Sequence, residues 1–329
     1  IMTNLLKNQI IIDGLEYCNW NREILEDIKN GGITAVHITL VYWENTEESF
    51  NKILEAQKLI QKNTDILCHA KTTEDILNAK KNNKVAFIFG FQNSAPIAND
   101  IFLVENFFNK GLRFMQLTYN NQTPLGGGCF ESKDSGVSRF GKAVIEEMNR
   151  LGMIIDLSHA GKITCLDAIE ISKNPVAISH ANPSFFHQSL RNIDNEVLIK
   201  LAKKNGFIGL SLYPYHLKNY GNCKIEEFCT MIKELINLIG SDNIGIGSDL
   251  CLNWQDDVVM WMRNGKWTKN TDYGESKDKN IKWPEQPSWY QKPSDINNIF
   301  KAMIKNGINE KIAIKILGMN WLNFMKNHF

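Results

Sequence analysis

Short runs of apolar, often β-branched residues recur along the chain at fairly regular intervals. Near-continuous apolar runs of this length are typical of parallel strands that are buried on both faces. Eight such runs occur, at residues 10–12, 36–41, 85–89, 114–118, 153–157, 176–179, 207–213 and 244–247. We therefore expect eight parallel strands.

Helical periodicity fills the intervals between these runs. Apolar residues three and four positions apart occur in residues 21–29, 47–61, 73–81, 101–110, 139–151, 163–171, 195–204 and 225–239. Several of these segments begin with a capping-type residue, such as Thr73 ahead of Glu74 and Asp75. Strands that alternate with helices eight times predict either a closed barrel or a doubly wound sheet.

The count of eight favours the barrel. The segment after the first run, Asp13-Gly14-Leu15-Glu16, lacks the glycine-rich fingerprint of a dinucleotide-binding sheet. We therefore predict an α/β fold, a (β/α)₈ TIM-type barrel that forms a single domain over residues 1–329.

Residues 254–293 do not follow the alternation of strands and helices. The segment is polar and irregular, yet it holds five of the eight tryptophans, at positions 254, 261, 267, 283 and 289. Disordered linkers are depleted in aromatic residues, so we expect this segment to be packed. Because it follows the eighth strand, we interpret it as a lid or pocket wall; a surface elaboration on neighbouring helices is the alternative. Residues 294–329 predict a helical tail with breaks at Gly307 and Gly318.

Composition and charge narrow the class of protein. Charged residues make up 22% and nearly cancel, to a formal net charge of +1, which argues against a nucleic-acid partner. No segment reaches the roughly 18 apolar residues that a membrane helix needs, and the first residues lack a signal-peptide pattern. None of the seven cysteines forms a Cys-x-x-Cys pair, so we expect a reduced, cytoplasmic protein.

Reactive side chains follow several of the predicted strands. His159 and His180 end the fifth and sixth strands, and Asp249 ends the eighth. Barrel enzymes build their active sites at this end of the strands. Adjacent strands lie about 5 Å apart, so the two histidines could share one metal ion. Asp249 would then act as a ligand or as a general base. His187 and His216, in loops near the same mouth, are weaker candidates for substrate contact.

Four short motifs occur in an order and spacing that resemble a known family. The chain resembles the renal or membrane dipeptidase family, zinc peptidases of the amidohydrolase superfamily. The motifs are Asp156-Leu157-Ser158-His159, Ile178-Ser179-His180-Ala181-Asn182, Leu190-Arg191-Asn192 and Gly245-Ile246-Gly247-Ser248-Asp249, and Gly318-Met319-Asn320 is similar to the family's closing Gly-x-Asn.

The resemblance implies chemistry for individual residues. In that family two zinc ions share a bridging glutamate and cleave small dipeptides, including those with a C-terminal D-residue. His159 and His180 match the ligands of the second zinc, and Asp249 matches the aspartate beside the first. Arg191 matches the arginine that binds the substrate carboxylate. The resemblance also suggests a homodimer.

Four positions depart from the family pattern. Leu15 and Tyr17 stand where the first zinc has a His-x-Asp pair, and Gln92 stands in place of the bridging glutamate. Leucine cannot bind a metal, and a neutral amide is a weaker zinc ligand than a carboxylate. Tyr119 replaces a histidine thought to polarise the scissile carbonyl. We therefore expect one zinc ion rather than two.

These observations predict a dipeptidase-like hydrolase that acts on a dipeptide or a similar small carboxylate-bearing amide. The predicted site comprises catalytic Asp249 and Tyr119, metal-binding His159 and His180, and substrate-binding Arg191, Tyr213, Gln92 and Asn93. Two alternatives stay open: a metal-free enzyme, and a non-catalytic binding barrel. If several of the aromatic residues near the predicted mouth line it, we expect a small, cationic amino-acid derivative as the ligand in those cases; ordinary barrel and lid packing of these residues is the alternative.

Overall fold

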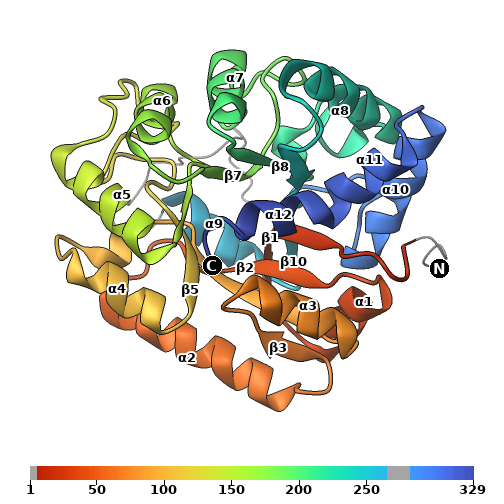
Figure 1. The fold of residues 1–329 in the computed structure, drawn as a ribbon, viewed down its shortest axis with the longest axis horizontal. Helices are drawn as coiled ribbons and strands as arrows, with labels where there is room; N and C mark the ends of the chain where they lie inside the picture. Colours follow the sequence, from red (N-terminus) through yellow and green to blue (C-terminus); the bar gives the residue numbers. More distant parts are fainter. Residues whose placement is uncertain (1–5, 265–281) are drawn as a thin grey trace.

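A closed barrel of eight parallel strands forms the body of the molecule (Figure 1). The computed structural model describes residues 6–264 and 282–329. The strands of the closed barrel are β1 (Ile12–Cys18), β2 (Ala35–Val41), β4 (Val85–Phe91), β5 (Leu112–Gln116), β6 (Ile154–Asp156), β7 (Ala177–Ala181), β8 (Phe207–Leu210) and β9 (Ile244–Ile246). Neighbours in this order pair in parallel, and Asp13 of β1 pairs with Ile246 of β9 to close the ring. The predicted (β/α)₈ barrel is confirmed.

Helices connect the strands and cover the outside of the barrel (Figure 1). They are α1 (Arg22–Asn30), α2 (Thr46–Lys62), α3 (Thr73–Lys81), α4 (Phe102–Asn109), α5 (Arg139–Leu151), α6 (Lys162–Ile171), α7 (Asn195–Lys203) and α8 (Ile225–Ile239). Each lies within a residue of its predicted bounds at either end. The cap of α3 is Thr72 rather than Thr73, because the Thr72 side chain accepts from the backbone N–H of Asp75 at 3.2 Å.

The first strand differs most from its prediction. It covers Ile12–Cys18 rather than residues 10–12, so Leu15 and Tyr17 lie within the strand. The buried polar side chains of this strand find partners inside the protein; Asp13 accepts from the backbone N–H of Ser248 at 2.7 Å. Two short strands were not predicted: β3 (Leu67–His69) pairs with the start of β4, and β10 (Leu250–Leu252) pairs with the end of β1.

The C-terminal helix α12 (Asn320–Met325) closes the barrel at the end opposite the site. Its Trp321 is fully buried, donates to the carbonyl of Ile246 at 2.7 Å and packs on Phe207. Asn320 donates to the carbonyls of Ser241 and Ile244, both at 2.8 Å. A side chain at Gly318 would meet the carbonyl oxygen of Ile10 at 2.0 Å. The Gly-x-Asn motif is therefore structural in this chain.

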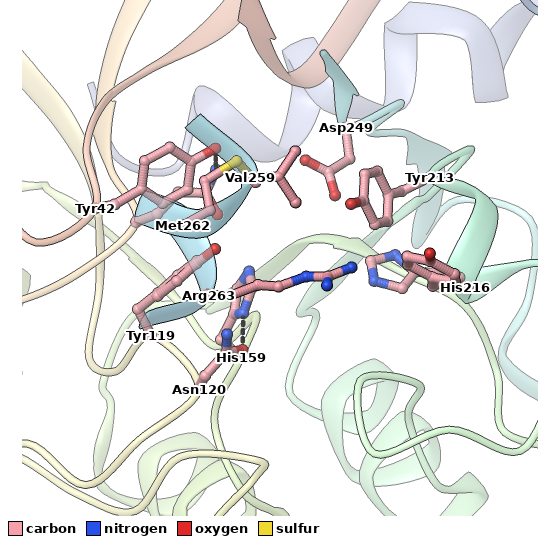
Figure 2. A pocket seen from close by; sticks show the side chains of 12 residues that line it. Tyr42, Tyr119, Asn120, His159, Tyr213, His216, Asp249, Val259, Met262 and Arg263 are labelled. Carbon is pink, nitrogen blue, oxygen red and sulfur yellow. Dashed lines mark hydrogen bonds between the residues drawn. The ribbon is translucent and has the colours of Figure 1, made fainter. Parts of the chain in front are cut away.

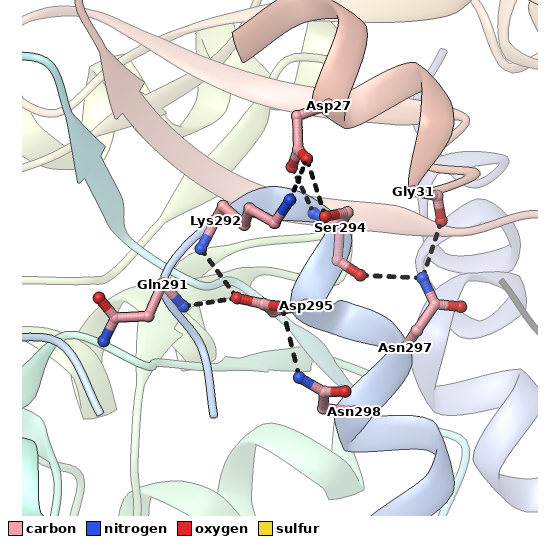
Figure 3. A network of polar contacts seen from close by, with 8 residues as sticks. All are labelled: Asp27, Gly31, Gln291, Lys292, Ser294, Asp295, Asn297 and Asn298. Carbon is pink, nitrogen blue, oxygen red and sulfur yellow. Dashed lines mark hydrogen bonds and ion pairs between the residues drawn. The ribbon is translucent and has the colours of Figure 1, made fainter. Parts of the chain in front are cut away.

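A polar network around Asp27 of α1 attaches the chain to the barrel where the segment 254–293 ends (Figure 3). The Asp27 carboxylate accepts from the Ser294 backbone N–H, the Ser294 hydroxyl and Lys292 Nζ, each at 2.9 Å. Asn297 donates to the carbonyl of Gly31 at 3.2 Å. These contacts fix the start of the helical tail, α10 (Ile296–Lys305) and α11 (Glu310–Ile314).

The aromatic-rich segment 254–293, predicted to be a lid or pocket wall, contains one α-helix in its described part, α9 (Asp256–Asn264). Three lid tryptophans donate from the indole N–H to backbone carbonyls: Trp254 to Tyr17, Trp283 to Gln255, and Trp289 to Cys223. Trp267 lies outside the described residues. In the described part of the chain, none of the helices has the length and apolar character required to cross a bilayer.

Candidate active site

A cavity with a volume of about 40 Å³ opens at the carboxyl ends of the barrel strands (Figure 2). Its wall combines aromatic, polar and charged side chains from the loops after β2, β4, β5, β6, β8 and β9, and from helix α9. The lining residues are Tyr42, Gln92, Tyr119, Asn120, His159, Tyr213, Tyr215, His216, Asp249, Val259, Met262 and Arg263. A concave site where a few polar groups converge is typical of small-molecule binding.

The two predicted histidines contact each other where His159 lines the cavity, with His180 behind it. His159 follows β6 and His180 lies in the neighbouring strand β7, and their Nε2 atoms are 3.1 Å apart. The Nδ1 atom of His159 lies 2.6 Å from Oδ1 of Asn120. Each ring is therefore held through Nδ1, and the two Nε2 atoms face each other.

A buried polar chain sets the tautomer of His180. The Ser179 hydroxyl donates its single proton to Asp156 Oδ2 at 2.5 Å, so the Ser179 oxygen accepts from Nδ1–H of His180 at 2.8 Å. The Ser158 hydroxyl donates to the other carboxylate oxygen of Asp156 at 2.8 Å and helps to fix it. Nε2 of His180 then presents a lone pair toward His159.

Both imidazoles are neutral bases at neutral pH. Burial lowers the pKa of His159 and of His180 well below the usual value, and the positive charge of Arg191 lowers both pKa values further. With Asn120 Oδ1 accepting from Nδ1–H of His159, two Nε2 lone pairs converge. Two lone pairs that face each other repel unless a cation lies between them. The two nitrogens are therefore placed as two ligands of one metal ion would be.

The positions that the resemblance assigns to a first zinc do not fit one here. Leu15 has no donor atom, and burial raises the pKa of Tyr17, so its phenol stays protonated. The Gln92 side-chain amide donates from Nε2 to Thr39 Oγ1 at 2.8 Å and to Tyr42 Oη at 3.2 Å. In the described part of the chain, no three His, Cys, Asp or Glu side chains are grouped so that they could hold a metal. The two facing histidines therefore have no third His, Cys, Asp or Glu side chain grouped with them among the described residues.

Three lining residues have backbone angles that L-amino acids seldom adopt. The φ angles of Asn120, His159 and Asp249 are 61°, 66° and 55°, in the left-handed region. Asn, Asp and His are the non-glycine types that tolerate this region best, at a cost of order 1–3 kcal/mol each. The backbone holds them there: Asp249 donates from N to the carbonyl of Leu15, and the His159 carbonyl accepts from Cys129 N, both at 2.9 Å. Strain of this kind is typical of functional sites.

Opposite charges share the cavity. Asp249 approaches from the loop after β9, and Arg263 reaches in from α9 with only 7% of its surface exposed. Figure 2 shows the Arg263 side chain extending toward the side of the cavity that holds His216 and Tyr213. The site can therefore contact both an anionic and a cationic group of one ligand.

Five of the eight predicted site residues line the cavity: Gln92, Tyr119, His159, Tyr213 and Asp249. His180 lies behind His159. The other two are not among the lining residues: Arg191 donates from Nη2 to the carbonyl of His180 at 3.0 Å, and Asn93 Oδ1 accepts from the N–H of Ser94. The roles assigned to all eight stay predictions.

Sequence reasoning missed Tyr42 and Arg263. Tyr42 follows β2, a strand end for which no reactive residue was predicted. Val259, Met262 and Arg263 have the 0, 3, 4 spacing of one helical face, which is the signal that could have identified α9 as a cavity wall. His216, a weaker candidate, does line the cavity.

The fold and this site together define a (β/α)₈ barrel with a pair of facing histidines at the carboxyl ends of its strands. The chain belongs to the membrane dipeptidase family, peptidase family M19, whose family model matches residues 9–254. It is 33% identical to an amidohydrolase from Pseudomonas aeruginosa, with a TM-score of 0.93 and coverage of 98% of this chain and 97% of that chain.

More distant relatives agree on the family or the fold. Dipeptidase tcpJ from Claviceps purpurea is 24% identical over 292 residues, 87% of this chain and 61% of that protein. The chain thus spans about three fifths of the length of this curated relative. A metallo peptidase from Rhodobacter sphaeroides, solved with a phosphinate mimic of L-Ala-D-Ala, shares the fold at 16% identity, with a TM-score of 0.82 and coverage of 98% of this chain and 100% of that chain.

Proposed function

We propose that this chain hydrolyses the amide bond of a dipeptide or a similar small carboxylate-bearing amide, with one metal ion instead of two. The observation that carries the proposal is the pair of neutral imidazoles, with Nε2 atoms 3.1 Å apart, one of which lines the same cavity as Asp249. The solved relative with a dipeptide mimic supports the substrate class.

His159 and His180 are the residues that would hold the ion. When bound, a metal of this kind supplies Lewis-acid polarisation and a water molecule of lowered pKa. Gln92 is a candidate for a further oxygen ligand, because its side chain lines the cavity and its Nε2 donates to Thr39 and Tyr42, which leaves Oε1 as the free acceptor. The neutral tautomers set by Asp156 and Asn120 keep the two histidines ready to bind.

Side chains that line the cavity carry out the remaining catalytic steps. Asp249 is the general base that takes a proton from the attacking water. Tyr119, whose ring packs on His159 with a centroid distance of 4.3 Å, has a hydroxyl that can donate to the developing oxyanion. The Tyr213 ring and the Gln92 amide position the substrate between them. The lid helix α9 covers the mouth and limits the entry of water.

A panel of dipeptides that includes L-Ala-D-Ala tests the proposal. We expect turnover of at least one member, and a loss of about 10²–10⁴-fold in kcat in Asp249→Asn, because the amide cannot accept the proton. Asparagine suits the left-handed backbone at position 249, so folding is preserved. Asp242→Asn, on the exposed surface, serves as the matched control. No turnover across the panel, with or without added zinc, would contradict the proposal.

A second candidate is a binding barrel for a small cationic amino-acid derivative. Four tyrosines line the same cavity as Asp249; the Tyr42 and Tyr119 rings lie 5.0 Å apart, and the Tyr213 and Tyr215 rings 5.8 Å apart. Aromatic faces beside a carboxylate attract ammonium groups. Calorimetric binding of panel members without any hydrolysis would favour this candidate over the hydrolase.

A further inference from the structure

The arginine that the family resemblance assigns to the substrate carboxylate is set back from the cavity. Arg191 is 1% exposed and is not among the lining residues. Its Nη2 donates to the carbonyl of His180, behind the histidine pair, at 3.0 Å. Its charge acts there on the imidazoles, since it lowers the pKa of both His159 and His180.

A different arginine occupies the cavity. Arg263 is the single Lys or Arg among the lining residues, and its guanidinium crosses the space in Figure 2. It shares one face of α9 with Val259 and Met262, which also line the cavity. A guanidinium carries five N–H donors, so a partner within the protein and a carboxylate of a ligand can be bound together.

The helix that carries Arg263 is anchored to the barrel mouth. The indole N–H of Trp43 donates to the carbonyl of Met262 at 3.1 Å, and the Trp43 ring packs edge-on against Tyr119. Just before α9, Trp254 stacks on Tyr17 with ring centroids 4.7 Å apart and donates to the Tyr17 carbonyl. These contacts tie α9 and the residues just before it to the neighbouring strands β1 and β2, so the helix that carries Arg263 is fixed at the cavity.

We propose that Arg263 binds the carboxylate of the substrate and so takes over the role that the resemblance assigns to Arg191. This inference rests on the proposed function for the substrate class. It explains how the cavity selects a zwitterion: Arg263 pairs with the carboxylate, and Asp249 with the surrounding tyrosines faces the opposite end of the ligand. A ligand without the carboxylate leaves the buried guanidinium without that contact.

The test compares L-Ala-D-Ala with its C-terminal amide, in which a neutral –CONH₂ group replaces the carboxylate. If the dipeptide is cleaved, the preference is the ratio of kcat/KM for the acid to kcat/KM for the amide. If it is not cleaved, the preference is the ratio of the two calorimetric Kd values. The test therefore still works if the hydrolase proposal fails. The native protein should prefer the acid about 100-fold, and Arg263→Gln should reduce the preference to near one. Arg263→Lys, which keeps the charge and loses the fork, should fall between.

Arg139→Gln, an exposed arginine on α5, should keep the native ratio. Thermal unfolding establishes that each variant folds. A preference for the acid that survives in folded Arg263→Gln would overturn the proposal, and so would a native protein that binds or cleaves neither ligand.

Discussion

At the scale of single residues, Glu16 is the most unusual side chain outside the cavity. It is fully buried, and its Oε1 atom has no hydrogen-bond partner. The pairing of β1 with β2 shifts register between Asp13 and Glu16, which breaks the strict alternation of the strand and brings these two acids close together. Burial, and then the nearby Asp13, raise the pKa of Glu16 well above its usual value. Burial therefore favours the protonated form of this carboxyl in the folded protein.

Glu16→Gln should change how stability depends on pH. The unfolded chain releases the Glu16 proton above about pH 4.3, while the folded chain keeps it until its raised pKa is reached, so native stability falls through this window as pH rises. A glutamine resembles the protonated acid and does not ionise. Relative to the native protein, the variant should gain about 1.4 kcal/mol in unfolding free energy per pH unit above this point.

Urea unfolding at pH 5 and pH 8 measures the effect. Glu234→Gln, an exposed position on α8, is the matched control and should follow the native protein at both values. Identical pH dependence in Glu16→Gln and the native chain would show that Glu16 ionises in the folded state.

At the scale of elements, the carboxylate of Asp27 links α1 to the start of the helical tail. It accepts three hydrogen bonds, two from Ser294 and one from Lys292. Asp27→Ala removes the acceptor of the Ser294 backbone N–H and should lower the unfolding free energy by about 2 kcal/mol, the usual loss for bonds to a charged group.

A neighbouring acid on the same helix provides the comparison. Glu26 makes an exposed ion pair with Arg22, at 2.7 Å, and such pairs contribute less than about 1 kcal/mol. Urea unfolding of Asp27→Ala and Glu26→Ala separates the two cases. Equal losses would mean that the Asp27 network does not fasten the tail to the barrel.

At the scale of the whole molecule, the barrel could be predicted because its signals are local. Apolar runs and helical periodicity depend on neighbouring residues, and the eight helices match their predicted bounds closely. The first strand was misplaced because its polar residues, such as Asp13, are satisfied by distant partners such as Ser248, which periodicity does not reveal.

The candidate site was predictable to a similar extent. The rule that strands of a barrel share one mouth brought His159, His180 and Asp249 into one region. Arg191 instead contacts the carbonyl of His180 and does not line the cavity. Arg263 lines it because α9 packs on the rim, through contacts such as the one between Trp43 and Met262. A local sequence pattern does not reveal tertiary contacts of this kind.

The central claim is that the site binds one metal ion, through His159 and His180. Zinc analysis of protein purified without chelator and dialysed against trace zinc tests it directly, with His159→Asn as the variant because asparagine tolerates the left-handed backbone there. His187→Asn, outside the cavity lining, is the control. We predict about one zinc per chain in the native protein and in the control, and none in His159→Asn. Two zinc ions per chain, or none, would contradict the account.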